Sequence, residues 1–137
     1  MPKMFVHTRR GFLTAESRVQ IAAALTDLGM ACERLADTEE VRAGIWVFFT
    51  EYAPDAIFSG GRIASSPIMT LVVYALEGGL DKASKNRLIA EATAILGDHA
   101  GLNDGQVPLY IVIQEVPEVS WGMYGKQVSL SALRADG

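Results

Sequence analysis

The chain opens with MPKMFVHTRRG (residues 1–11), a short stretch that predicts the first strand of the fold. Its side chains alternate, because Phe5 and His7 fall on one face of an extended chain and Val6 falls on the other. A period of two is typical of a strand with a different environment on each face. The glycine that follows the paired arginines ends this strand.

Pro2 is the residue of this stretch that bears most directly on chemistry. A methionine before a small residue is normally removed, and we expect that step to leave Pro2 with a free secondary amine. A secondary amine is a good base or nucleophile once it is desolvated. If Met1 stays in place, Pro2 is a peptide-bonded amide with no basic nitrogen. The chemistry of Pro2 therefore depends on the processing of Met1.

The residues that follow predict a helix and a second strand. Thr14 is a suitable N-cap, and apolar residues recur behind it at helical spacing. The predicted apolar face consists of Ile21, Leu25, Leu28, Cys32 and Leu35. A polar stretch at residues 37–42 ends the helix. Residues 45–49 (IWVFF) then predict a strand that is buried on both faces, with Trp46 in the core.

The second half of the chain begins the same pattern again. Pro67 precedes an apolar run at residues 68–74, which predicts a third strand. Asp81 is a suitable N-cap for a second helix, whose apolar residues again follow the helical period. Residues 101–105 are rich in turn formers, and residues 109–113 predict the fourth long strand.

The two halves are therefore pseudo-repeats, about residues 2–63 and 67–128, of a single domain that spans residues 1–137. Pro2 and Pro67 lie 65 positions apart. Each β-α-β unit makes a right-handed crossover between parallel strands. We predict an α+β fold in which the two units form a four-stranded sheet with two helices on one face. The other face stays apolar and needs a partner, which is a physical argument for an oligomer.

Composition restricts the partners and the compartment. The formal net charge of −4 gives no electrostatic reason for nucleic-acid binding, and no apolar run is long enough for a membrane span. No secretory leader is visible, and we expect a cytoplasmic protein. Cys32, the one cysteine, is predicted to be a buried hydrophobe. Neither a metal nor another cofactor is expected, because His7 and His99 stand far apart without ligand-spaced cysteines or carboxylates.

Three features together resemble the tautomerase superfamily, the group that includes 4-oxalocrotonate tautomerase. They are the Met-Pro start, the duplicated unit and the ending IQEVPEVSWGMYGK (residues 113–126). The resemblance covers roughly residues 2–128. The fused length is similar to that of the double-unit members, which include malonate semialdehyde decarboxylase and cis-3-chloroacrylic acid dehalogenase. Those members imply a homotrimer.

The resemblance implies a function and a set of site residues. Pro2 would act as the general base of a cofactor-independent tautomerase that moves a proton in a small 2-oxo or enol carboxylic acid. Burial and nearby cations bring the pKa of such an amine toward neutrality, where a base is most efficient. Arg9 is the implied catalytic cation. Arg10, Tyr110 and Trp121 are the implied substrate-binding residues.

Other interpretations remain open. The loop at residues 76–79 lacks the arginines of the decarboxylase and dehalogenase relatives, and Phe12 stands where 4-oxalocrotonate tautomerase has an arginine. The alternative is a non-catalytic or differently specialised (decarboxylase- or hydratase-type) trimeric member that binds small acids. A ferredoxin-like or small-ligand sensor domain shares the alternating elements but gives no reason for a proline at position 2. We interpret His7 as structural, and expect residues 129–137 to form a tail that packs on a neighbouring subunit.

Overall fold

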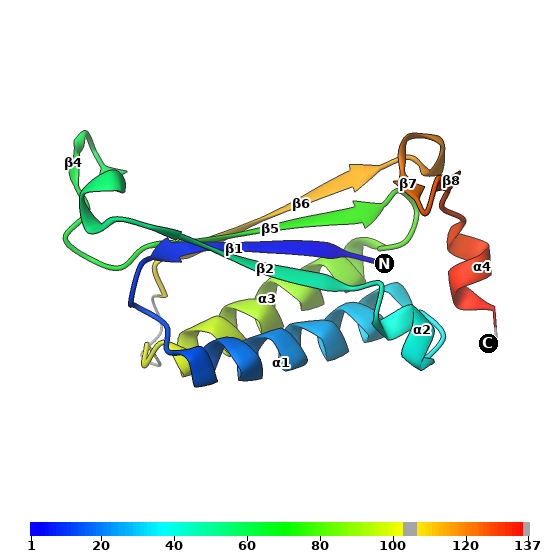
Figure 1. Ribbon diagram of the computed structural model, residues 1–137, viewed down its shortest axis with the longest axis horizontal. Helices are drawn as coiled ribbons and strands as arrows, with labels where there is room; N and C mark the ends of the chain where they lie inside the picture. Colours follow the sequence, from blue (N-terminus) through cyan, green and yellow to red (C-terminus); the bar gives the residue numbers. More distant parts are fainter. Residues whose placement is uncertain (103–106, 136–137) are drawn as a thin grey trace.

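The structure, a computed structural model, describes residues 1–102 and 107–135 and contains two β-α-β units (Figure 1). The first unit comprises β1 (Lys3–Arg9), α1 (Ala15–Glu33) and β2 (Trp46–Tyr52), and the second comprises β5 (Met69–Leu76), α3 (Lys82–His99) and β6 (Leu109–Val116). Shorter elements fill the connections: α2 (Glu39–Arg42), η1 (Pro54–Ala56), β3 (Phe58–Ser59), β4 (Arg62–Ile63), η2 (Glu118–Ser120), β7 (Gly122–Met123), β8 (Lys126–Gln127) and α4 (Leu130–Arg134). The predicted turn at residues 101–105 lies largely outside the described residues.

The two units join edge to edge into one four-stranded sheet in the order β2-β1-β5-β6. The strands within each unit are parallel, and β1 pairs with β5 in the antiparallel direction. Both long helices lie on the same face of this sheet, as Figure 1 shows. The predicted α+β fold is confirmed, including the placement of the helices on one face. We call the opposite face, which no helix of the described residues covers, the open face.

The core lies between the sheet and the two helices. Alternate residues of β1 are buried, so Met4 and Val6 face the helices while Phe5 and His7 face the open side. Four of the five residues predicted for the apolar face of α1 are buried in the main core: Ile21, Leu25, Leu28 and Cys32. The fifth, Leu35, lies beyond the helix, which ends at Glu33 and not at the polar stretch 37–42, and it packs in a second cluster. Both predicted N-caps are also confirmed: Thr14 accepts from the backbone N–H of Ser17 at 3.0 Å, and Asp81 accepts from that of Ser84 at 2.7 Å.

The prediction that the second strand is buried on both faces was wrong. β2 is an edge strand, and Trp46 and Phe48 on its open side are 46% and 44% exposed. Alternate residues of β2, Val47 and Phe49, pack against the helix-side core instead. An apolar run therefore marks β2 correctly as a strand, but only one of its faces is covered by a helix. Trp46 belongs to the open face and not to the core.

The C-terminal segment packs on its own chain, which corrects the expected tail on a neighbouring subunit for residues 129–135. Leu130 of α4 joins a second apolar cluster with Met1 and Trp121. The guanidinium of Arg134 donates to the backbone oxygens of Glu33 at 2.9 Å and of Gly79 at 2.8 Å. These contacts hold α4 beside the N-terminus of the chain (Figure 1).

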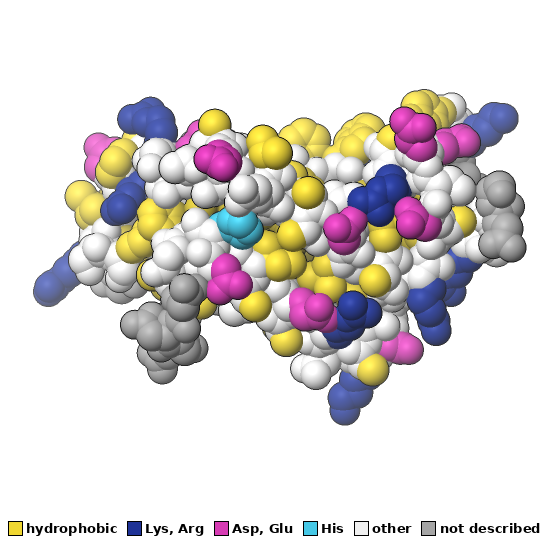
Figure 2. All heavy atoms as spheres, turned by 90° about the horizontal axis from the view of Figure 1, so that it is seen from below, with side chains coloured by type: hydrophobic (Ala, Val, Ile, Leu, Met, Phe, Trp, Pro, Cys, Tyr) yellow, Lys and Arg dark blue, Asp and Glu magenta, His cyan; other side chains and the backbone are white. Residues whose placement is uncertain are grey.

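The two faces of the molecule differ in character. Figure 2 shows the helix-covered side, on which acidic and basic side chains lie interspersed. The open face instead presents large apolar side chains of β2 and β6 that are more than two-fifths exposed: Trp46, Phe48, Tyr110 and Val112. A contiguous apolar face of this kind favours association. The oligomer remains a prediction.

Gly29 sets the distance between α1 and the start of β1. A Cβ atom placed on Gly29 would lie 2.9 Å from Cγ of Pro2 and 3.0 Å from Cε of Met4. We predict that Gly29→Ala lowers the free energy of unfolding by roughly 1–3 kcal/mol, because the ring of Pro2 has no flexible end to move aside. Urea unfolding measures this loss. Gln20→Ala, at an exposed site on the same helix, should stay within about 0.5 kcal/mol of the parent; an equal or greater loss there would contradict the packing argument.

Candidate active site

An aromatic cleft lies on the open face beside the N-terminus, and we call it the Lys3 cleft. It has a volume of about 550 Å³. β1, β2 and β5 form its floor, and the segment after β6 forms its wall. The lining residues are Lys3, Phe5, Trp46, Phe48, Tyr74, Val116, Ser120, Trp121 and Gly122. In the part of the chain that the structure describes, Lys3 is the one charged side chain of this lining.

Strand register brings the aromatic side chains of the cleft together. Phe5 stands opposite Phe48 of β2, and their rings stack with centroids 4.8 Å apart. Tyr74 of β5 meets the ring of Phe5 edge-on at 5.8 Å, and Trp46 meets Phe48 in the same manner at 6.4 Å. Stacked and edge-to-face pairs of this geometry stabilise one another. The cleft therefore has an ordered, apolar floor.

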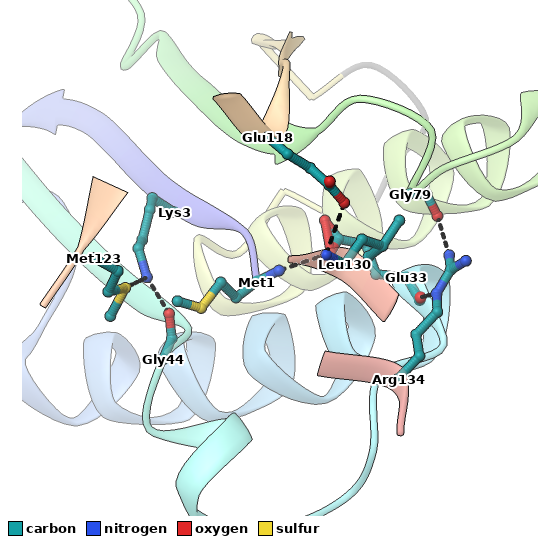
Figure 3. Close-up of polar contacts among 9 residues, drawn as sticks. All are labelled: Met1, Lys3, Glu33, Gly44, Gly79, Glu118, Met123, Leu130 and Arg134. Carbon is teal, nitrogen blue, oxygen red and sulfur yellow. Dashed lines mark hydrogen bonds and ion pairs between the residues drawn. The ribbon is translucent and has the colours of Figure 1, made fainter. Parts of the chain in front are cut away.

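Lys3 points its ammonium group into the edge of this aromatic array. Its Nζ donates a hydrogen bond to the backbone oxygen of Gly44 and lies 3.7 Å from Sδ of Met123 (Figure 3). The same Nζ lies 4.4 Å from the centroid of the Trp46 ring. All three neighbours are neutral. Burial lowers the pKa of Lys3 to about 8, and the opposing effect of the Glu33 carboxylate is smaller.

Pro2 directly precedes Lys3 but does not line the cleft; it is buried, with its ring against Gly29 of α1 and its nitrogen in a peptide bond to Met1. The Met1 ammonium forms an ion pair with Oε2 of Glu33 at 2.8 Å, and both side chains are buried (Figure 3). Burial lowers the pKa of this ammonium, while Glu33 opposes the shift. Oε1 of Glu33 has no hydrogen-bond partner among the described residues. The N-terminus is thus an integral part of the packed interior.

The structure separates the predicted site residues into two groups. Trp121 lines the Lys3 cleft and shares an apolar cluster with Met1, so it lies at the Pro2 end of the sheet. Arg9 and Arg10 lie at the other end of β1, roughly 23 Å from Pro2 at about 3.3 Å per residue. Tyr110 begins β6 at that same far end. Within one chain these three residues do not meet Pro2, and their predicted roles require a second copy.

Tyr110 belongs to another cleft at the far end of the open face, which we call the His7 cleft. Its volume is about 420 Å³, and it is lined by His7, Tyr52, Ala56, Ile57, Phe58, Ile68, Thr70, Val72 and Tyr110. Nδ1 of His7 and the hydroxyl of Tyr52 form a hydrogen bond of 2.8 Å. This satisfied ring nitrogen supports the structural interpretation of His7.

Sequence reasoning found Trp121 but missed Lys3 and the aromatic residues Phe5, Phe48 and Tyr74 of the same cleft. The signal was present in the alternation of β1, which places Lys3 and Phe5 on the same face as His7. Their neighbours on β2 and β5 lie far away in the sequence. The cleft can therefore be recognised only once the order of the strands in the sheet is known. Among residues 1–102 and 107–135, no three His, Cys, Asp or Glu side chains are grouped closely enough to hold a metal ion. No helix in these ranges has both the length and the apolar character of a membrane span.

Comparison with known proteins agrees with this architecture. The family model described as "Tautomerase enzyme" matches residues 71–131, which cover most of the second unit. No curated protein matches the chain. The match to the family model is confined to the second unit and the segment that follows it, and the solved structures share the fold of both units.

Three solved structures share the fold over nearly the whole chain. A member of the cis-3-chloroacrylic acid dehalogenase family has a TM-score of 0.77 at 22% identity, covering 93% of this chain and 83% of that chain. A fused 4-OT described as an asymmetric trimer has a TM-score of 0.75 at 18% identity, covering 96% and 98%. A protein inactivated by 2-oxo-3-pentynoate has a TM-score of 0.76 at 20% identity, covering 95% and 97%.

The ion pair of Met1 and Glu33 gives a stability prediction. Removing one partner of a buried pair leaves an uncompensated charge, so Glu33→Ala should lower the free energy of unfolding by about 3–5 kcal/mol in protein that retains Met1. Urea unfolding, with the mass of the N-terminal peptide measured in parallel, tests this. Glu39→Ala, an exposed carboxylate of α2, is the matched control. Equal losses in the two variants would refute a role for the pair.

Lys3 gives a prediction about alkaline pH. Its folded-state pKa of about 8 lies below the ordinary value of 10.5, so the unfolded chain binds more protons between these pH values. The contribution of Lys3 to stability should therefore rise as the pH increases from about 8 toward 10.5. The free energy of unfolding of the parent and of Lys3→Met, each measured at pH 7 and pH 10, isolates the contribution of Lys3 to the pH dependence of stability. A difference between the two proteins that does not change with pH would contradict the prediction.

Proposed function

We propose that the protein is a cytoplasmic, cofactor-independent tautomerase that moves a proton in a small 2-oxo or enol carboxylic acid, with Pro2 as general base once Met1 is removed. The observation that carries the proposal is the position of Pro2, buried at the start of β1 and directly before Lys3, the cation of an aromatic cleft. The likeness to tautomerase-superfamily proteins supports the same reaction class. Neither nucleic acid nor membrane has a part in this function.

The chemistry needs an amine that is neutral at the working pH. A free α-amine ordinarily titrates at about 7.7–8.0, and burial disfavours its charged form. The neutral amine of Pro2 would take a proton from the carbon next to the carbonyl and return it to another carbon of the conjugated system. Cations near the carboxylate and the developing enolate would lower the barrier between the two steps.

In a homotrimer, a neighbouring chain would supply the arginines that the Pro2 end of a single chain lacks. The open face is apolar, and one fused 4-OT with this fold is a trimer. In such an assembly the far end of one chain can approach the Lys3 cleft of the next. Arg9 would then act on the enolate, and Arg10 and Tyr110 would contact the substrate next to Trp121.

A second function is favoured by the ion pair of Met1. The Met1 ammonium and side chain are accommodated inside the fold, with Glu33 as the counter-ion. A chain that keeps Met1 has no basic nitrogen at Pro2. In that state we propose a non-catalytic protein that binds small acids in the Lys3 cleft.

Activity measurements test the catalytic proposal. We expect enol-to-keto conversion of phenylpyruvate or 2-hydroxymuconate, and a loss of about 10²–10⁴-fold in kcat/KM for Pro2→Ala, since positioned general bases contribute that much. Pro67→Ala is the matched control, because Pro67 holds the equivalent position in the second unit. Equal rates for the parent and Pro2→Ala would sink the proposal.

The state of the N-terminus separates the two functions. Intact mass shows whether Met1 is present in protein from the native host. Treatment with 2-oxo-3-pentynoate, which inactivates one protein of this fold, should add one label to the peptide that begins at Pro2. Retained Met1 without labelling would favour the binding protein.

A further inference from the structure

We propose that Lys3 is the carboxylate-binding residue of the Lys3 cleft, and that the cleft takes a flat aromatic carboxylic acid. This inference deepens the proposed function, since it names the residue and the ligand class of that same site, and its catalytic consequence rests on that function. The binding step itself needs no basic nitrogen at Pro2. It therefore applies to the catalytic and the non-catalytic alternatives alike.

The Lys3 ammonium has an incomplete set of partners. Its neighbours are the carbonyl of Gly44, the thioether of Met123 and the ring of Trp46, all neutral. Among residues 1–102 and 107–135, no carboxylate lies within ion-pair distance of Nζ. An ammonium has three donors, and a half-buried one without an anion is costly to retain. A carboxylate entering the cleft would complete this set.

The charged and titratable groups that face Lys3 do not replace such an anion. Glu33 of α1 acts on Lys3 only at longer range, and its Oε2 is held by the Met1 ammonium. The Met1 ammonium itself carries the same sign as Lys3. Tyr74 of β5, on the cleft floor, presents a phenol and no carboxylate.

The floor of the Lys3 cleft suits a flat ring in both shape and chemistry. The Phe5 and Phe48 rings are parallel within 7°, and Trp46, Tyr74 and Trp121 stand around them. A flat ring can therefore lie against aromatic surface while its carboxylate reaches Nζ. The cleft volume of about 550 Å³ falls within the usual range of small-molecule sites. Among the described residues of one chain, Lys3 is the cation of the lining that can pair with this carboxylate.

The His7 cleft can be compared with the Lys3 cleft position by position, because the two β-α-β units correspond in sequence. Ile68 lies 65 positions after Lys3, the same separation as that of Pro2 and Pro67. Ile68 lines the His7 cleft, so an apolar side chain takes the place of the cation there. The two corresponding clefts thus differ in charge. The anion site is expected only in the Lys3 cleft.

Intrinsic fluorescence gives a direct test, because the chain has two tryptophans and both line the Lys3 cleft. The probe is 3-phenylpropionate, which has a ring and a carboxylate but undergoes no tautomerisation. Its neutral analogue 3-phenylpropanamide and the ringless acetate are the comparison ligands. We expect saturable quenching by 3-phenylpropionate, with affinity at least about tenfold weaker for each comparison ligand. The acid should also bind more weakly as the pH rises through about 8, where Lys3 loses its charge.

Variants assign the effect to Lys3. Lys3→Met should weaken binding of 3-phenylpropionate by about tenfold or more and abolish its preference over the amide, while Lys3→Arg keeps the preference. Lys82→Met, at an exposed position of α3, should bind like the parent. Thermal unfolding verifies that each variant is folded. Lys3→Met should unfold at a higher temperature than the parent, because it removes a half-buried charge.

The outcomes decide between the inference and the proposed function. Absence of quenching, equal affinity for acid and amide, or unchanged acid affinity in Lys3→Met overturns the inference. Binding through Lys3 without proton transfer in Met1-free protein overturns the proposed function alone. Proton transfer in Lys3→Met with the kcat/KM of the parent overturns the inference alone.

Discussion

The pairing of β1 on both of its edges is the constraint on which the molecule depends. β2 lies parallel on one side and β5 antiparallel on the other, so the position of β1 sets the register of both units. The pleat then sends Met4 and Val6 into the core and Lys3, Phe5 and His7 to the open face. A slip by one residue would exchange the two sets and bury a charge. The requirement for an apolar core thus fixes the place of the cleft.

The N-terminus is held by a second constraint, the close approach of α1. Gly29 leaves room for the ring of Pro2, a contact that does not involve Met1. The ammonium of Met1 reaches the buried carboxylate of Glu33, where α4 also docks through Arg134. The same packing therefore positions Pro2 and determines its chemistry, because the nitrogen of Pro2 is basic only when Met1 is absent.

Periodicity predicted the fold well, since the helical spacing from Ile21 to Cys32 and the strand alternation are local properties that tertiary structure confirmed. It failed for Trp46, because an apolar run does not reveal that its strand lies at the edge of the sheet. Of the predicted substrate residues, Trp121 alone lies at the Pro2 end. Arg9 lies at the other end because β1 runs almost the length of the sheet (Figure 1). The local sequence pattern does not specify which residues of neighbouring chains come into contact.

Lys3 escaped prediction for a different reason: a lysine at the start of a strand is ordinary until distant segments surround it. The two units form two clefts on the open face that differ chemically, with Lys3 in one and Ile68 in the other. An apolar residue at position 3 would fit the aromatic floor without the desolvation that lowers the pKa of Lys3. A residue that makes the fold less stable than another residue would at the same position is expected where function requires it. The presence of Lys3 is therefore better explained by the binding of an anion than by the stability of the fold.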